Sequence, residues 1–217
     1  MTFGQICSQN RRKVVVHHTH LIPDIVSLLK HGDLVFFDDC LYSQYVFLRS
    51  NSDALDKLGI IRVLGLSPKA VRPDETDGIY EVESAVLHSQ LNEQVKVISD
   101  ETNGDYIRGF MSISEVKTLL TNKNTFLALH GCCHLDMKKV PKFQQPTLFS
   151  KDLEDGVEAL GKFGLDTDIF VYPYAYEPFI SVRILHERGF RHIFAGKYTK
   201  RIPIDELNHD FREHNKE

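Results

Sequence analysis

Two histidines enclose a short segment that is rich in potential metal ligands. Residues 129–137 read LHGCCHLDM, with His130 and His134 on either side of Cys132 and Cys133. Histidines four residues apart on one helical turn face the same way, so both imidazoles can reach one ion. An alternative is a closed structural zinc site that combines the thiolates with His134. The sequence contains no second CxxC-type pair to complete such a site, which favours the two histidines.

An aspartate pair offers the oxygen ligand and the base that a catalytic site needs. Asp38 and Asp39 directly follow the apolar run LVFF at residues 34–37. Adjacent residues at a strand end point in different directions, so one aspartate can bind a metal while the other takes a proton from water. Two histidines and one aspartate leave a coordination position open, as in catalytic zinc sites. A turn or a helix N-cap is the simpler interpretation of an isolated aspartate pair.

Three apolar runs each lead directly into residues that could take part in a catalytic site. LVFF leads into the aspartate pair, TFLAL at residues 125–129 leads into the histidine segment, and IFVY at residues 169–172 leads into Pro173 and Tyr174. In parallel α/β folds the residues beyond the carboxyl ends of the strands meet on one face, where sites are built. We therefore expect the three groups to form one site.

The rest of the sequence predicts the scaffold. Strands are expected at residues 13–16, 34–37, 60–66, 125–129, 169–172 and 193–195. Helices are expected at residues 113–120, at 150–163 with Ser150 as the cap before an acidic first turn, and at 179–188 before Gly189. This alternation favours a parallel α/β fold, and six or seven such units suggest a small or incomplete barrel. Turn signals within residues 72–108 indicate a hairpin or a helical excursion, and no linker divides the chain.

Composition narrows the class of protein. The 217 residues are 42% hydrophobic and 26% charged, with a formal net charge of −4 and no long basic run, so no nucleic-acid partner is expected. No apolar run approaches the roughly 18 residues that cross a bilayer, and no signal peptide is evident, so we expect a cytoplasmic protein without a membrane partner. The four cysteines are then expected to be free thiols or ligands. The sequence does not indicate an oligomeric state.

Three motifs resemble those of the polysaccharide deacetylase family (NodB homology, carbohydrate esterase family 4). The FFDDC segment at residues 36–40 stands where that family has TFDDG. The HGCCH segment at residues 130–134 stands where it has HSxxH or HGxTH, and FVYPYA at residues 170–175 resembles its FxYPYG form. The resemblance spans about residues 14–204, with the motifs in the family's order.

The resemblance implies a distorted (β/α)7 barrel in a single catalytic domain, residues 1–217 with a core at about 14–204. It implies hydrolysis of an N-acetyl amide on an amino sugar or glycan, with a divalent metal, zinc first and cobalt, nickel or iron(II) as alternatives. Carried over by motif, the metal ligands are Asp39, His130 and His134, the general base is Asp38, and the substrate contacts are Tyr174 (through its N–H), Pro173 and His18. His209, in the faint LxLH-like segment LNHD, is the candidate general acid.

Other interpretations stay open at this level. The same scaffold can hydrolyse a cyclic or other small amide, because a fold does not fix a substrate. A non-catalytic glycan-binding protein can also keep the scaffold, and the weak match to the general-acid motif motivates that reading. The aspartate at residue 38 argues against a pure binder, which has no need of a base beside a metal ligand.

Overall fold

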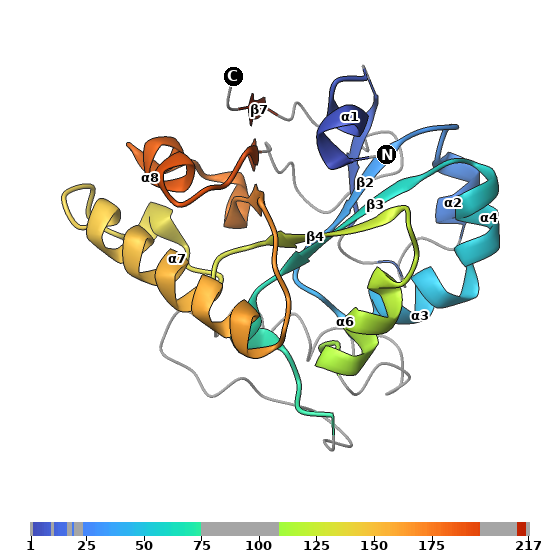
Figure 1. Cartoon of the computed structure of the whole chain (residues 1–217), viewed down its shortest axis with the longest axis horizontal. Coiled ribbons are helices and arrows are strands. Elements are labelled where there is room, and N and C mark those ends of the chain that lie inside the picture. Colours follow the sequence, from blue (N-terminus) through green and yellow to red (C-terminus); the bar gives the residue numbers. More distant parts are fainter. Residues whose placement is uncertain are drawn as a thin grey trace.

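The computed structural model describes residues 2–9, 11–16, 19, 24–74 and 109–195, together with the backbone of residues 212–215. All strands in this part of the chain belong to one sheet, ordered as they follow in the sequence (Figure 1). They are β1 (Lys13–Val15), β2 (Leu34–Phe37), β3 (Ile61–Leu66), β4 (Thr125–Leu129), β5 (Ile169–Val171), β6 (His192–Ala195) and β7 (Arg212–Asn215). Strands β1 to β6 are parallel, whereas β7 pairs with β6 in the antiparallel direction.

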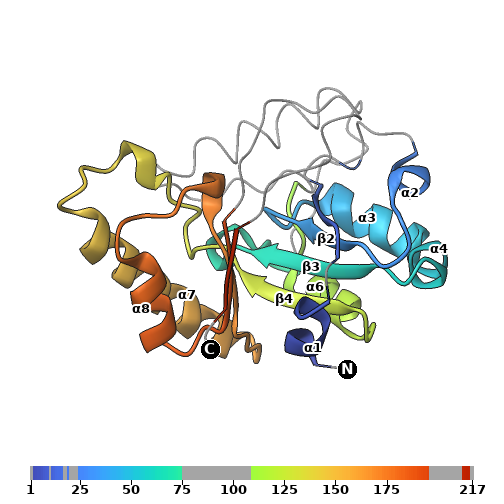
Figure 2. The same cartoon turned by 90° about the horizontal axis from the view of Figure 1, so that it is seen from above.

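Helices that connect consecutive strands lie on the outside of the sheet, whereas α1 precedes β1 (Figures 1 and 2). The α-helices are α1 (Phe3–Cys7), α2 (Ile25–Leu28), α3 (Tyr42–Ser50), α4 (Ser52–Lys57), α6 (Ile113–Leu120), α7 (Gln145–Lys162) and α8 (Ser181–Glu187). Short 3-10 turns are η2 (Pro68–Ala70), η3 (Met137–Lys139) and η4 (Pro173–Ala175). None of the helices in the described ranges is both long and apolar enough to span a membrane.

The sheet is strongly curled. The rings of Phe36 in β2 and Phe194 in β6 lie 4.8 Å apart between centroids. These strands are four places apart in the sheet order, which in a flat sheet would separate them by roughly 19 Å. Phe3 of α1 fills the same interior, with ring centroids 5.0 Å from Phe126 and 6.2 Å from Phe194. The strands therefore curve around a packed interior, as in a distorted barrel.

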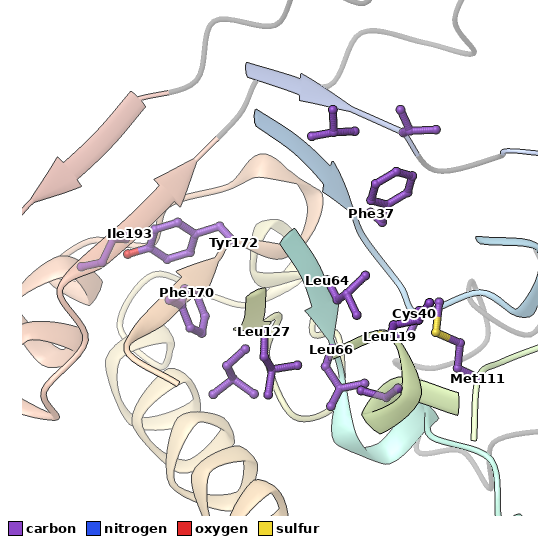
Figure 3. Packing of buried hydrophobic residues seen from close by; sticks show 14 of the residues in the cluster. Phe37, Cys40, Leu64, Leu66, Met111, Leu119, Leu127, Phe170, Tyr172 and Ile193 are labelled. Carbon is purple, nitrogen blue, oxygen red and sulfur yellow. The ribbon is translucent and has the colours of Figure 1, made fainter. Parts of the chain in front are cut away.

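Alternating side chains divide the core between the two faces of the sheet. Val14 and Val35 belong to the cluster that packs against the helices, whereas Val15 and Phe36 belong to the interior cluster. Figure 3 shows part of the helix-side cluster, where Leu64 and other strand residues meet the helices. Burial of both faces explains why the strands are short, nearly continuous apolar runs.

The predicted barrel architecture and its strands are confirmed, with each of the six predicted strands present to within one residue at either end. The prediction that a helix begins at Ser150 is wrong, because α7 begins at Gln145. Pro146 suits the first turn of that helix, and Phe149 packs its ring 5.7 Å from Phe170, which extends the buried face toward the N-terminus. Helix α8 starts at Ser181 rather than residue 179 because Ile180 has a left-handed backbone, φ 62°. The interpretation of residues 72–108 as a hairpin or helical excursion concerns residues 75–108, which lie outside the described residues.

Candidate metal centre

Three side chains predicted to bind a metal come together at the carboxyl ends of β2 and β4. Oδ1 of Asp39 lies 2.9 Å from Nε2 of His134 and 3.5 Å from Nε2 of His130. One donor atom from each residue lies within 4.8 Å of the others, and all three side chains are buried. Two imidazoles and one carboxylate at this spacing can share one divalent cation.

Hydrogen bonding sets the tautomer of His130. Nδ1 of His130 lies 2.9 Å from the carbonyl oxygen of Val171, and because a carbonyl only accepts, Nδ1 carries the proton. Nε2 then presents its lone pair, buried and without a hydrogen-bond partner among the described residues. This is the usual second contact of a metal-binding histidine. Burial lowers the pKa of His130, but the neighbouring carboxylates of Asp38 and Asp39, together with the carbonyl of Val171, outweigh it and raise the pKa.

The chain carries these ligands on strained turns. Asp39, Cys40 and His134 have φ values of 74°, 51° and 51°, in a backbone region that residues other than glycine rarely adopt. Gln44 of α3 holds the aspartate turn, because its Nε2 donates to the carbonyl of Asp38 at 2.6 Å and its Oε1 accepts the N–H of Leu41 at 3.1 Å. Such backbone conformations persist only where the surroundings impose them.

The carboxylate of Asp38 lies beside Gly65 at the end of β3. A Cβ on Gly65 would lie 2.7 Å from Oδ1 of Asp38, so the missing side chain makes room for the acid. Asp38 is fully buried and contributes to the electrostatic field at His130. Cys40, two residues after Asp38, donates its thiol to the carbonyl of Gly65 at 3.2 Å. The predicted base therefore lies among the predicted ligands, and Cys40 is not one of them.

The third motif forms another wall. Pro173 is buried in η4 beside Gly131, where a Cβ on the glycine would lie 3.3 Å from Cγ of the proline. The Tyr174 ring lies 4.6 Å from that of His134 between centroids, on a backbone with φ 54°. Burial, and then the charge of Asp39, raise the pKa of Tyr174, so its hydroxyl stays neutral. Both residues predicted from this motif therefore lie at the centre.

Two predicted residues fall outside the described part of the chain. These are His18, expected to contact substrate, and His209, expected to be the general acid. Their roles stay predictions.

The adjacent cysteines form a separate group with Asp152 of α7. Cys132, Cys133 and Asp152 each place one potential ligand atom within 4.8 Å of the others. His134 belongs instead to the group with Asp39 and His130. The alternative that combined both thiolates with His134 in one closed site is therefore not the arrangement within the described residues.

Three residues that support the site were not predicted. Gly65 in a buried strand and Gln44 in a helix carry no pattern that marks them. Asp152 looked like an acidic residue in the first turn of a helix, because the start of α7 was placed too late. Pro146 was a signal for the earlier start of α7, because proline suits the first turn of a helix.

Comparisons with known proteins agree with this architecture. No protein-family model and no curated protein matches the chain. Among solved structures, IcaB from Ammonifex degensii superposes with a TM-score of 0.55 at 20% identity, over 86% of this chain and 84% of that one. A de-N-acetylase from Aggregatibacter actinomycetemcomitans superposes with a TM-score of 0.52 at 13% identity, over 89% of this chain and 74% of that one. The chain shares the fold of these two proteins. The resemblance predicted from the motifs is thus confirmed at the level of the fold.

Proposed function

We propose that this protein is a metal-dependent N-deacetylase of the polysaccharide deacetylase type, which hydrolyses the acetamido group of an amino sugar or glycan. The observation that carries the proposal is the meeting of Asp39, His130 and His134 around one point, with Asp38 next to them. The shared fold with a protein named as a de-N-acetylase supports it.

The residues present fit a divalent metal. Nε2 of His130 is buried, carries a lone pair and has no hydrogen-bond partner among the described residues, which would be costly without a ligand. The donor set of two nitrogens and one oxygen suits zinc first, and cobalt, nickel or iron(II) as well. A metal bound there would polarise the amide carbonyl and lower the pKa of water toward about 7.

The chain's own groups then share the remaining steps. Asp38 accepts the proton of the attacking water as general base. The backbone N–H of Tyr174 donates to the oxygen that becomes negative when the water oxygen attacks the amide carbon. Collapse breaks the C–N bond and releases acetate, and the amine nitrogen takes a proton, for which His209 is the candidate donor. Pro173 and His18 are proposed to contact the sugar.

Metal analysis paired with acetate release tests the proposal. The purified protein is expected to hold about one equivalent of metal and to release acetate from members of a panel of N-acetylated amino sugars. Asp38→Asn keeps the side chain's size and is expected to retain the metal while losing about 10²- to 10⁴-fold in turnover. Asp39→Asn is expected to lose both.

Two outcomes would contradict the proposal. Glycan binding that is unchanged in Asp38→Asn, with no turnover under any divalent metal, would identify a non-catalytic binder. Acetate release or ring opening from small cyclic amides, with none from acetylated sugars, would move the activity to another amide substrate.

A further inference from the structure

The loop between His130 and His134 is tied to helix α7 by a single carboxylate. Oδ2 of Asp152 accepts the N–H of Cys132 at 2.9 Å, and Oδ1 accepts the N–H of Cys133 at 2.9 Å. Asp152 is 7% exposed. Both oxygens of one buried side chain therefore hold consecutive amides of the segment that connects the two imidazoles.

Two glycines let the carboxylate reach this loop. Gly131 has φ +70°, and a Cβ there would lie 2.9 Å from Oδ2 of Asp152. Gly156, one turn further along α7, faces the same loop, and a Cβ there would lie 3.1 Å from Cδ1 of Leu129 and 3.5 Å from Cβ of Cys132. The close approach of helix and loop thus depends on the absence of side chains at both positions.

The arrangement is unfavourable for the carboxylate unless the loop stays in place. Burial raises the pKa of Asp152, and the hydrogen bonds from Cys133 and Cys132 act in the opposite direction. The observed loop conformation, in which His134 has φ 51°, brings both amides to the buried charge. Hydrogen bonds to an ionised acceptor are about twice as strong as neutral ones, which suits them to hold a strained turn.

We propose that Asp152 is the positioning residue of the metal centre, which sets the separation and direction of the His130 and His134 imidazoles toward Asp39. The inference rests on the proposed function only in taking both histidines as metal ligands. Asp152 touches no ligand itself and acts through the backbone of Cys132 and Cys133. Outer groups that orient metal ligands change metal affinity by about 10- to 100-fold when they are replaced.

Cobalt(II) binding without substrate tests this role. Asp152→Asn keeps the size of the side chain and one acceptor oxygen but turns an amide NH₂ toward one of the two N–H donors. Its Co²⁺ affinity, measured by visible absorption and chelator competition, is expected to fall about tenfold. Amide exchange at Cys132 and Cys133 is expected to speed up. Glu158→Gln, an exposed position of the same helix where the carboxylate pairs with Lys162, is the matched control and is expected to change neither.

A second variant approaches the same contact from the loop. Gly131→Ala places a methyl group against Oδ2 of Asp152 and is also expected to weaken Co²⁺ binding, which keeps the test decisive if Asp152→Asn does not fold. Wild-type Co²⁺ affinity in the folded variants would overturn the proposal. Weaker Co²⁺ binding by Asp152→Asn, in a protein that releases no acetate from any substrate, would support this role while overturning the proposed function.

Discussion

A side chain at residue 65 would occupy the space in which the carboxylate of Asp38 lies, because a Cβ on Gly65 would be 2.7 Å from Oδ1. Asp38 directly follows β2 and Gly65 lies in the neighbouring parallel strand β3, where Phe37 pairs with Leu64, the residue before the glycine. Asp38 is fully buried, so its carboxylate has no open solvent into which it can retreat. The strand next to the proposed base thus determines where that base can point.

Gly65→Ala is therefore expected to displace the Asp38 carboxylate and reduce turnover by about 10²-fold, the usual effect of misplacing a reacting group by about 1 Å. Metal content is expected to stay near the wild-type value, and the crowded site is expected to cost about 1–3 kcal/mol of unfolding free energy. Acetate release, elemental analysis and urea unfolding measure these effects.

Gly161→Ala is the control for that substitution. Gly161 lies in α7, and a Cβ there would meet no atom of the surrounding structure within 4 Å. Alanine is therefore expected to leave activity unchanged and to stabilise the helix by roughly 0.5–1 kcal/mol. Full activity in Gly65→Ala would contradict the proposed role of Asp38.

Removal of the metal is expected to abolish activity while leaving the fold in place. Both faces of the sheet carry apolar clusters that do not depend on an ion. A metal present at 100 times its Kd contributes about 2.7 kcal/mol, so the chelated protein should unfold cooperatively at a Tm lower by roughly 5–10 °C. Far-UV circular dichroism measures whether the fold persists after chelation, and acetate release before and after addition of Zn²⁺ measures the loss and recovery of activity. A chelated protein already unfolded at 25 °C would indicate a structural metal instead.

The paired thiols are expected to be dispensable for metal binding. In the double variant Cys132→Ser, Cys133→Ser the backbone N–H groups that bind Asp152 remain, and none of the proposed ligands changes. Metal content is expected to match the wild type, with turnover within about threefold, since no bond to substrate or metal is removed. A protein that loses its metal would show that thiolates belong to the centre.

Cys40→Ser, which buries a hydroxyl in the helix-side core, is expected to cost about 1–3 kcal/mol of stability.

The aromatic contact across the interior is expected to support the whole barrel. Phe194→Ala removes a fully buried ring that contacts Phe36 and Phe3, and should lower the free energy of unfolding by about 3–5 kcal/mol. Phe143→Ala, at a position that is 80% exposed, should change it by less than about 0.5 kcal/mol. Equal effects in urea unfolding would contradict the curled arrangement of β2 and β6.

The strands could be predicted because each is an apolar run buried on both faces, and parallel strands place their carboxyl ends together. That reasoning brought Asp39, His134 and Tyr174 into one site from three separate motifs. Strand β7 was missed because Arg212–Asn215 reads REHN, which has no apolar residue. A strand without an apolar residue leaves no hydropathy signal.

The supporting residues could not be predicted because their roles depend on tertiary distances. Gln44 reads as an ordinary helical residue until its amide is seen to bridge the carbonyl of Asp38 and the N–H of Leu41. Asp152 reads as a helix-dipole acid when α7 is started at Ser150, and becomes a buried acceptor only when the helix starts at Gln145. An error of a few residues at a helix start thus hid the contact.

The left-handed backbone at Asp39 and His134 has a consequence for transplantation of the centre. Peptides that carry FFDDC or HGCCH will relax into ordinary turns, in which the aspartate and the imidazoles point elsewhere. Copying these motifs onto another scaffold transfers the donor atoms but not the backbone conformation that orients them. The portable unit is each turn together with the helix that follows it, α3 with Gln44 and α7 with Asp152.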